Sequence, residues 1–310
     1  MSDENVEIWS GGVNTWECDE MGHMNVRFWV AKAQEGLAGL AARLGMPRAF
    51  AADGEATLIV REQHIRFLRE AKAGAALYMT GGVIEIGESD ARLLLVIRHA
   101  SGEPAATFQL LVEHATARDM RPFPWSARIR EQAEAFRTQV PAFAAARSVD
   151  LAPVTATASL PRALELGLTR VGLGVIGPAE CDVFGRMRPE IFIGRVSDGV
   201  GRLFGETRPG PESTGDEPPA RIGGAVLEYR VLHLGWPEAG DGVELRSGFA
   251  GCDARTRRVV HWMLDPETGA PWASAEAVVI SFDLDTRKVV DISPEAQAAF
   301  MAKCAPGLAL

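Results

Sequence analysis

The sequence lacks a long apolar run and has little positive charge. None of its apolar stretches reaches the roughly 20 residues that a transmembrane helix needs. With 32 Lys and Arg against 41 Asp and Glu, the formal net charge is −9, and no basic face typical of nucleic-acid binding is visible. We therefore expect neither a membrane nor a nucleic acid as a partner. The acidic start MSDENVE is unlike a presequence, so we expect a cytoplasmic protein.

Cysteine is scarce, and the motifs of several site classes are missing. The four cysteines form no CxxC pair and no zinc-ligand spacing, which predicts reduced thiols and no metal site. They are Cys18, Cys181, Cys252 and Cys304. No GxSxG elbow supports a serine hydrolase. Gly172, Gly174 and Gly177 spell GxGxxG, but Pro178 follows at once. Because that fingerprint requires a strand turning into a helix, we expect no dinucleotide there.

What is present indicates a globular protein with two domains. The chain has 310 residues, of which 47% are hydrophobic and 24% charged, and this length suits two domains of about 150 residues. In the first half, the patterns predict a strand at 6–16, a helix at 26–44, and strands at 57–68, 76–87, 91–99 and 105–116. A helix followed by an antiparallel meander is an α+β layout with a sheet wrapped on a helix. We place an N-terminal domain at 1–120, a helical connection at 121–150 and a C-terminal domain at 151–310.

A compact polar turn precedes the first predicted helix. Within Asp19–Asn25 the chain carries an acid, a glycine, a histidine and an asparagine. Asn25 is a good N-cap, and apolar residues then recur every three or four positions along 26–44. Asp19 and His23 thus lie beside the free N–H groups and the positive dipole end of a helix. Such a place can hold a polarised carbonyl oxygen next to a carboxylate.

The turn and its surroundings occur twice. Residues 180–200 align without gaps on 17–37, with identical Glu, Cys, Asp, Gly, Met and a later Gly, all 163 positions apart. Later matches are Glu62 with Glu228 and Gly74 with Gly240, 166 apart, and Arg118 with Arg287, 169 apart. A slowly drifting offset is expected for a duplicated domain, so we expect a second helix at about 190–205. The Pro- and Gly-rich segment 208–224 has no counterpart and is expected to be an exposed loop.

The motif D-x-x-G-H-x-N leading into an aromatic-bearing helix resembles the signature of hotdog-fold thioesterases of the 4-hydroxybenzoyl-CoA thioesterase type. The resemblance covers nearly the whole chain as two copies. It implies two tandem hotdog domains, each a long central helix wrapped by an antiparallel sheet, that form an internal pseudo-dimer by joining their sheets. In such dimers the substrate lies between the helix N-terminus of one copy and strands of the other. The strand with Glu228 to His233 is then the best candidate to line the site.

The resemblance also implies roles for individual residues. The motif's acid, Asp19, would attack the thioester or activate a water that does. The backbone N–H near Val26 would polarise the carbonyl as an oxyanion donor. His23 and Asn25 would shape the turn and orient water or the acyl carbonyl, and Gly22 belongs to the same substrate-binding turn. No cofactor is implied beyond coenzyme A as part of the substrate.

The second copy departs from the motif. Asp182 remains, but Arg186 and Arg188 stand where the first copy has histidine and asparagine, and Pro189 follows. Proline is compatible with a first helical position, yet it lacks the N–H that would polarise a carbonyl. We expect a degenerate second site. The two arginines could pair with Asp182, or they could bind a phosphate of coenzyme A.

The leading functional prediction is hydrolysis of an acyl-CoA thioester at one intact site. An acyl-ACP thioesterase, for which an acyl carrier protein would be the partner, is the nearest alternative. From another class, the chain could be a non-catalytic acyl-thioester-binding protein. A homo-oligomer is possible, and the acyl group is not predicted because the first copy lacks the second Asn and the Tyr that many relatives have.

Overall fold

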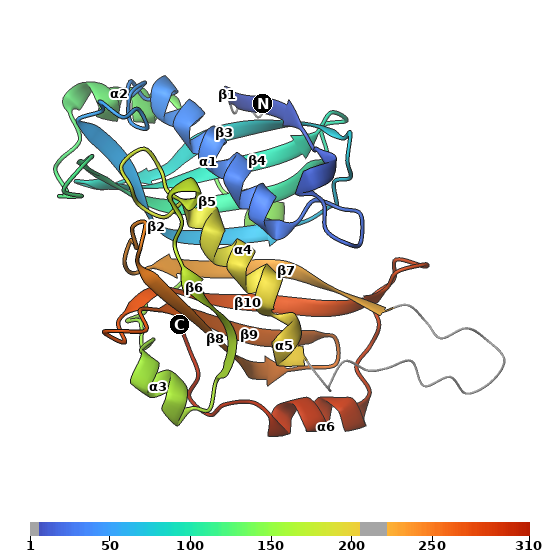
Figure 1. Cartoon of the computed structure of the whole chain (residues 1–310). Coiled ribbons are helices and arrows are strands. Elements are labelled where there is room, and N and C mark those ends of the chain that lie inside the picture. The colour runs from blue at the N-terminus through green and yellow to red at the C-terminus, as the bar shows by residue number, and fades with distance from the viewer. Residues whose placement is uncertain (1–5, 205–221) are drawn as a thin grey trace. The chain divides into compact units, whose positions relative to one another are not determined.

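The computed structural model describes residues 6–204 and 222–310 of the chain (Figure 1). The chain divides into two compact units. The first contains Met1–Arg147, Ile176–Ile193 and Trp236–Gly240, and the second contains Ser148–Val175, Gly194–Gly235 and Asp241–Leu310. The short segment that carries the second copy of the turn therefore belongs to the first unit by its contacts.

The first half of the chain builds five antiparallel strands and one long helix. The strands are β1 (Val6–Gly12), β2 (Ala56–Phe67), β3 (Ala76–Ile86), β4 (Asp90–His99) and β5 (Pro104–Thr116). They pair in the order β1-β3-β4-β5-β2. Helix α1 (Val26–Arg43) contacts β1, β3 and β4. The predicted helix and strands are therefore present, and apart from the first strand their bounds shift by one or two residues.

The predicted first strand is too long. It ends at Gly12, and Thr15–Glu17 form a short 3-10 helix, η1. The reason is a local capping interaction, because the Glu17 carboxylate accepts a hydrogen bond from the Asn14 N–H at 2.7 Å. This turn redirects the chain from the sheet edge toward the start of α1.

Helix α1 is stabilised by a capping residue at its start and by an apolar face that packs in the core. Asn25 is the N-cap, and its side chain accepts from the Arg27 N–H. The buried apolar side chains follow one helical face, namely Trp29, Val30, Ala33, Leu37, Leu40 and Ala41. Gly39 lets the helix approach β1 closely, since a Cβ there would lie 2.1 Å from the Ile8 carbonyl oxygen. The helix start that carries the turn is thereby fixed relative to the sheet.

The second half repeats the topology. Its strands are β6 (Thr169–Val175), β7 (Ile222–His233), β8 (Gly242–Cys252), β9 (Thr256–Leu264) and β10 (Pro271–Asp283), which pair in the order β6-β8-β9-β10-β7. The equivalent helical segment is α4 (Pro189–Gly199) followed by α5 (Gly201–Phe204). The expectation of two tandem hotdog domains is confirmed, whereas the joining of their sheets into an internal pseudo-dimer stays a prediction.

Two other sequence expectations can be placed on this fold. Gly172 and Gly174 lie inside β6, and Gly177 precedes the 3-10 helix η3 (Pro178–Glu180), so the GxGxxG segment is no strand-to-helix turn. Of the expected loop 208–224, residues 208–221 lie outside the described residues. The prediction is wrong for 222–224, which begin β7 because their backbones pair with β10.

The remaining helices connect and close the two halves. They are α2 (Ala127–Ala135), η2 (Ala142–Ala144), α3 (Leu160–Glu165) and α6 (Pro294–Ala302). The connection is held on the first sheet, where Thr138 donates its N–H to the Val83 carbonyl at 3.0 Å and the Gln109 side chain donates to the Ala144 carbonyl at 2.8 Å. All four cysteines are free thiols. Across the described residues, no helix is both long and apolar enough to cross a membrane.

Candidate active site

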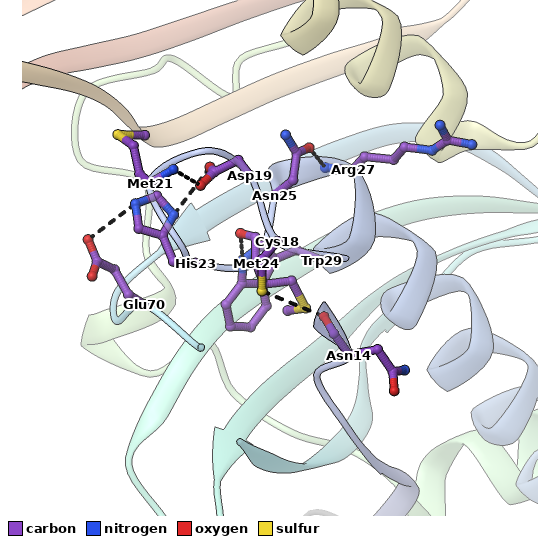
Figure 2. A network of polar contacts seen from close by, with 10 residues as sticks. All are labelled: Asn14, Cys18, Asp19, Met21, His23, Met24, Asn25, Arg27, Trp29 and Glu70. Carbon is purple, nitrogen blue, oxygen red and sulfur yellow. Dashed lines mark hydrogen bonds and ion pairs between the residues drawn. The ribbon is translucent and has the colours of Figure 1, made fainter. Parts of the chain in front are cut away.

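The first copy of the turn is closed by its own backbone. Asp19 donates its N–H to the His23 carbonyl at 3.0 Å, and Gly22 donates to the Asp19 carbonyl at 3.0 Å. Asp19 Oδ1 also accepts from the Met21 N–H at 2.9 Å (Figure 2). Gly22 has φ +79°, in the left-handed region that favours glycine. The sequence-predicted residues Asp19, Gly22 and His23 therefore share one tight turn.

The two titratable side chains of this turn face each other. His23 Nδ1 lies 3.3 Å from Asp19 Oδ2, and the two side chains are only 12% and 13% exposed. On the other side of the ring, His23 Nε2 lies 3.7 Å from Glu70 Oε1 (Figure 2). Sequence reasoning did not single out Glu70, because its loop meets the turn only in the folded chain, where His23 pairs with Lys72 and the Met24 N–H donates to the Ala71 carbonyl. The imidazole is thus flanked by two carboxylates.

Opposing influences act on the pKa of Asp19. Burial raises it, but the hydrogen bond and charge of His23, together with the N–H groups of Met21 and His23, outweigh burial. The net pKa is lower than the ordinary value of 3.8. Asp19 is therefore a shielded carboxylate that remains ionised at neutral pH.

The start of α1, which follows the turn directly, provides further hydrogen-bond donors. Asn25 occupies two of them, because its side chain accepts from the Arg27 N–H at 2.9 Å and its carbonyl from the Phe28 N–H at 2.9 Å. Among the described residues, no acceptor takes the Val26 N–H. Asn25 thus acts as a helix cap, and the Val26 N–H is available to a ligand.

The second copy reproduces the backbone of the turn. Asp182 donates its N–H to the Arg186 carbonyl at 2.7 Å, and Gly185, with φ +88°, donates to the Asp182 carbonyl at 3.1 Å. In both copies the cysteine before the acid donates its thiol to a backbone carbonyl four residues earlier, at 3.6 Å. The gap-free alignment of the two motifs is therefore a structural equivalence.

The side chains of the second turn make different contacts. Arg186 pairs with Asp182 through Nε and Nη2, at 3.2 and 3.1 Å, and Arg186 itself is 5% exposed. The suggested pairing of Arg188 with Asp182 is wrong. Arg188 Nε instead lies 3.3 Å from Glu190 Oε1, and its Nη2 donates to the Ala179 carbonyl.

Glu190 explains the position of Arg188. Its side chain is buried, and burial raises its pKa although Arg188 and Arg27 lower it, so the nearby arginine supplies the countercharge. Glu190 could not be singled out from the sequence, because an acid at the start of a helix is ordinary. Pro189 begins α4 and has no N–H to offer.

No metal site accompanies these groups within the part of the chain that the structure describes. No cluster there brings together three or more His, Cys, Asp or Glu side chains arranged to hold an ion. The described chemistry of the first turn is a carboxylate, an imidazole and a backbone donor.

Comparison with known protein families gives a match over both copies. The profile of the thioesterase-like superfamily matches residues 13–133 and 176–300, which together make up most of the chain. The chain belongs to this superfamily. The two matched regions each begin just before a copy of the turn, in keeping with a tandem thioesterase-like protein. No curated protein sequence matches the chain.

Solved structures with the same fold cover nearly the whole chain. One is a protein from Lactobacillus plantarum assigned provisionally as an oleoyl thioesterase, with 9% identity, a TM-score of 0.65, and coverage of 90% of this chain and 97% of that one. The 12:0-ACP thioesterase from Umbellularia californica has 12% identity and a TM-score of 0.62, covering 88% and 93%. An acyl-ACP thioesterase from Bacteroides thetaiotaomicron VPI-5482 has 10% identity and a TM-score of 0.62, covering 90% and 100%. At these identities the likeness concerns the fold.

Proposed function

We propose that this member of the thioesterase-like superfamily hydrolyses an acyl-CoA thioester at the first copy of the turn. The observation that carries the proposal is that the turn before α1 holds the shielded Asp19 carboxylate, while the Val26 N–H at the start of α1 has no acceptor among the described residues. A thioester carbonyl needs a nucleophile or base on its carbon and a donor on its oxygen, and this turn offers both. Membership of the superfamily supports the same reaction class.

The carboxylate and the N–H have complementary tasks in this reaction. Asp19 either attacks the carbonyl carbon or removes a proton from a water that attacks, and the negative charge that develops on the carbonyl oxygen is stabilised by the Val26 N–H. The C–S bond then breaks, and the thiolate takes up a proton to leave as a free thiol. When Asp19 is the nucleophile, water hydrolyses the resulting anhydride. His23, 3.3 Å from Asp19, orients the carboxylate and keeps it ionised.

We assign no turnover to the second copy. Its acid is paired with Arg186, which leaves Asp182 a poor base. Pro189 stands where the first copy has the free N–H. Because Pro189 has no N–H, the second turn would not stabilise the negative charge that develops on the carbonyl oxygen.

Two alternatives are distinguished by specific observations. Acyl-ACP thioesterases are among the proteins that share the fold, but an acidic carrier is disfavoured by a net charge of −9. A non-catalytic acyl-thioester binder would have little use for an ionised carboxylate beside a free helix N–H. Coenzyme A is therefore the preferred thiol.

Thiol release from a panel of acyl-CoAs tests the proposal. Asp19→Asn keeps the shape of the side chain and removes its charge, so hydrolysis should be abolished while the protein stays folded. Asp182→Asn is the matched control and should keep most of the activity. Equal losses would mean two working sites, and a loss confined to Asp182→Asn would place catalysis in the second copy. No thiol release by the unmodified chain from acyl-CoA or acyl-carrier thioesters would favour the binder.

A further inference from the structure

Two exposed side chains at the first turn, Trp16 and Lys72, have no partner among the described residues, and we call the place that they occupy the rim of the turn. Trp16, in η1, is 76% exposed. Within the described residues its indole makes no hydrogen bond and no ring contact. Lys72 is exposed as well, and no described carboxylate pairs with it. A large aromatic ring and a cation are thus left open to solvent beside the candidate active site.

The backbone brings the segments of these two residues together. His23 and Lys72 form an antiparallel bridge, and the Met24 N–H donates to the Ala71 carbonyl at 2.7 Å. Before η1, Val13 exchanges hydrogen bonds with the same loop, donating to the Ala75 carbonyl at 3.0 Å and accepting from the Gly74 N–H at 2.8 Å. Trp16 therefore lies on a chain segment that is anchored to the Lys72 loop on both sides.

The second copy lacks both features in an otherwise equivalent turn. Ala179 occupies the position of Trp16 in the alignment. Arg186 bridges Glu238 as His23 bridges Lys72, so a carboxylate replaces the ammonium. The ring and the cation are consequently absent from the copy to which we assign no turnover, and the shared backbone of the turn does not require them.

We propose that Trp16 and Lys72 bind the 4′-phosphopantetheine arm of the substrate, an assignment that rests on the proposed function. The arm adjoins the thioester sulfur, so it begins at the candidate active site. Trp16 and Asp19 are three positions apart, and three residue steps span at most about 11 Å of chain, so the ring is within reach of the arm. The indole face covers the apolar and amide part of pantetheine, and the Lys72 ammonium pairs with the phosphate.

The arm occurs in coenzyme A and on carrier proteins, and its chemistry fits the rim better than a protein surface does. The indole ring of Trp16 is large enough to cover a single extended chain such as pantetheine, and the single ammonium of Lys72 can pair with its one phosphate. Glu20 in the turn and Glu70 in the Lys72 loop are exposed, so these segments do not form the basic patch that the surface of an acidic carrier would need.

Binding of pantetheine and 4′-phosphopantetheine, measured by calorimetry, separates the two contributions. Trp16→Ala should raise the Kd of both ligands about tenfold, which corresponds to ~1.4 kcal/mol. Lys72→Ala should raise the Kd of phosphopantetheine several-fold and leave that of pantetheine unchanged, because only one ligand carries the phosphate. Val183→Ala, which removes an exposed apolar side chain from the second turn, and Lys303→Ala are matched controls and should bind like the unmodified chain.

Hydrolysis provides a second readout. With one acyl group, Trp16→Ala and Lys72→Ala should raise KM for the acyl-CoA and for the acyl-carrier thioester. Neither variant should affect the N-acetylcysteamine thioester, which lacks most of the arm. A KM change confined to the carrier thioester would mean that the rim contacts carrier protein, which would overturn the assignment.

Failure of this inference can be told apart from failure of the proposed function. If neither ligand binds, or if both variants bind like the unmodified chain, the arm does not lie on this rim, whatever the rate of hydrolysis. If binding depends on Trp16 and Lys72 but Asp19→Asn still releases thiol, the rim assignment stands and the assignment of Asp19 falls. Asp19→Asn should itself keep the affinity for phosphopantetheine.

Discussion

Asp19 keeps a low pKa only because His23 and nearby N–H groups outweigh the effect of burial. In the folded chain its carboxylate therefore protonates below its ordinary pKa, and the charge that we propose for catalysis persists as the pH falls. His23→Gln removes the imidazole's charge and alters its hydrogen bond, so the pKa of Asp19 should rise. We expect the acid limb of the kcat/KM profile to move to higher pH, as measured by thiol release across the acid range. An unchanged limb would show that His23 does not set the ionisation of Asp19.

The same shift has a consequence for stability. A carboxylate whose pKa is lower in the folded than in the unfolded chain stabilises the fold above the unfolded pKa, and this contribution is lost as the pH falls through the folded pKa. Unfolding of Asp19→Asn should accordingly depend less on pH in the acid range than unfolding of the unmodified chain. Equal pH dependence in urea titrations would contradict this expectation.

Val26 contributes a backbone group, so it is tested by removing that group alone. Proline fits the first turn of a helix, and the preceding Asn25 has φ −63° and ψ 146°, which a residue before proline can adopt. Val26→Pro should keep the fold and lower kcat by roughly 10²–10³, as expected for a lost oxyanion donor. Val26→Ala keeps the N–H and serves as the control. If the proline variant turned over as fast as the alanine variant, the oxyanion would have another donor.

At the scale of elements, the close approach of α1 to the sheet edge makes a specific demand on two glycines. A Cβ on Gly39 would lie 2.1 Å from the Ile8 carbonyl oxygen, whereas a Cβ on Gly36 would meet the flexible Met79 side chain, whose sulfur is also 2.1 Å away. The Ile8 carbonyl is part of a paired strand and cannot move aside, whereas the Met79 side chain can change its conformation. Gly39→Ala should therefore lower the free energy of unfolding by about 1–3 kcal/mol, and Gly36→Ala by less. Urea unfolding of both variants decides this, and the opposite order would contradict the contact at Ile8.

Elements were more predictable from the sequence than the contacts of individual side chains. Apart from the end of the first strand, alternation and turn residues placed the strands of the first half within one or two residues, because those signals act locally. The 3-10 helix at Thr15–Glu17 was missed although its signal was present, since Asn14 and Glu17 have the spacing of a capping pair. Glu70 could not be found, because only the folded sheet brings its loop to His23.

At the scale of the whole molecule, we expect the second copy to contribute to stability rather than to catalysis. Arg186 is 5% exposed and has Asp182 as its ionic partner, so Asp182→Asn leaves a buried cation without its countercharge. We expect the free energy of unfolding to fall by about 1–3 kcal/mol. This is below the cost of breaking a fully buried pair, because Asp182 is 33% exposed.

The double variant Asp182→Asn and Arg186→Met removes the uncompensated charge, and it should regain part of that stability. Urea unfolding of the two variants provides the measurement. If the single and double variants were equally stable, the Asp182–Arg186 pair would not hold the second turn.

Both turns are closed by backbone hydrogen bonds, so most side chains of the motif are not needed to close them. Asp19 and Asp182, with Gly22 and Gly185, maintain the same loop whether histidine or arginine follows. The positions that follow the acid can therefore differ between the two copies while the loop keeps its shape. The second turn is therefore a scaffold into which a site could be built. Replacing Arg186, Arg188 and Pro189 by histidine, asparagine and valine would give it the residues of the first turn on a backbone that already has the same hydrogen bonds.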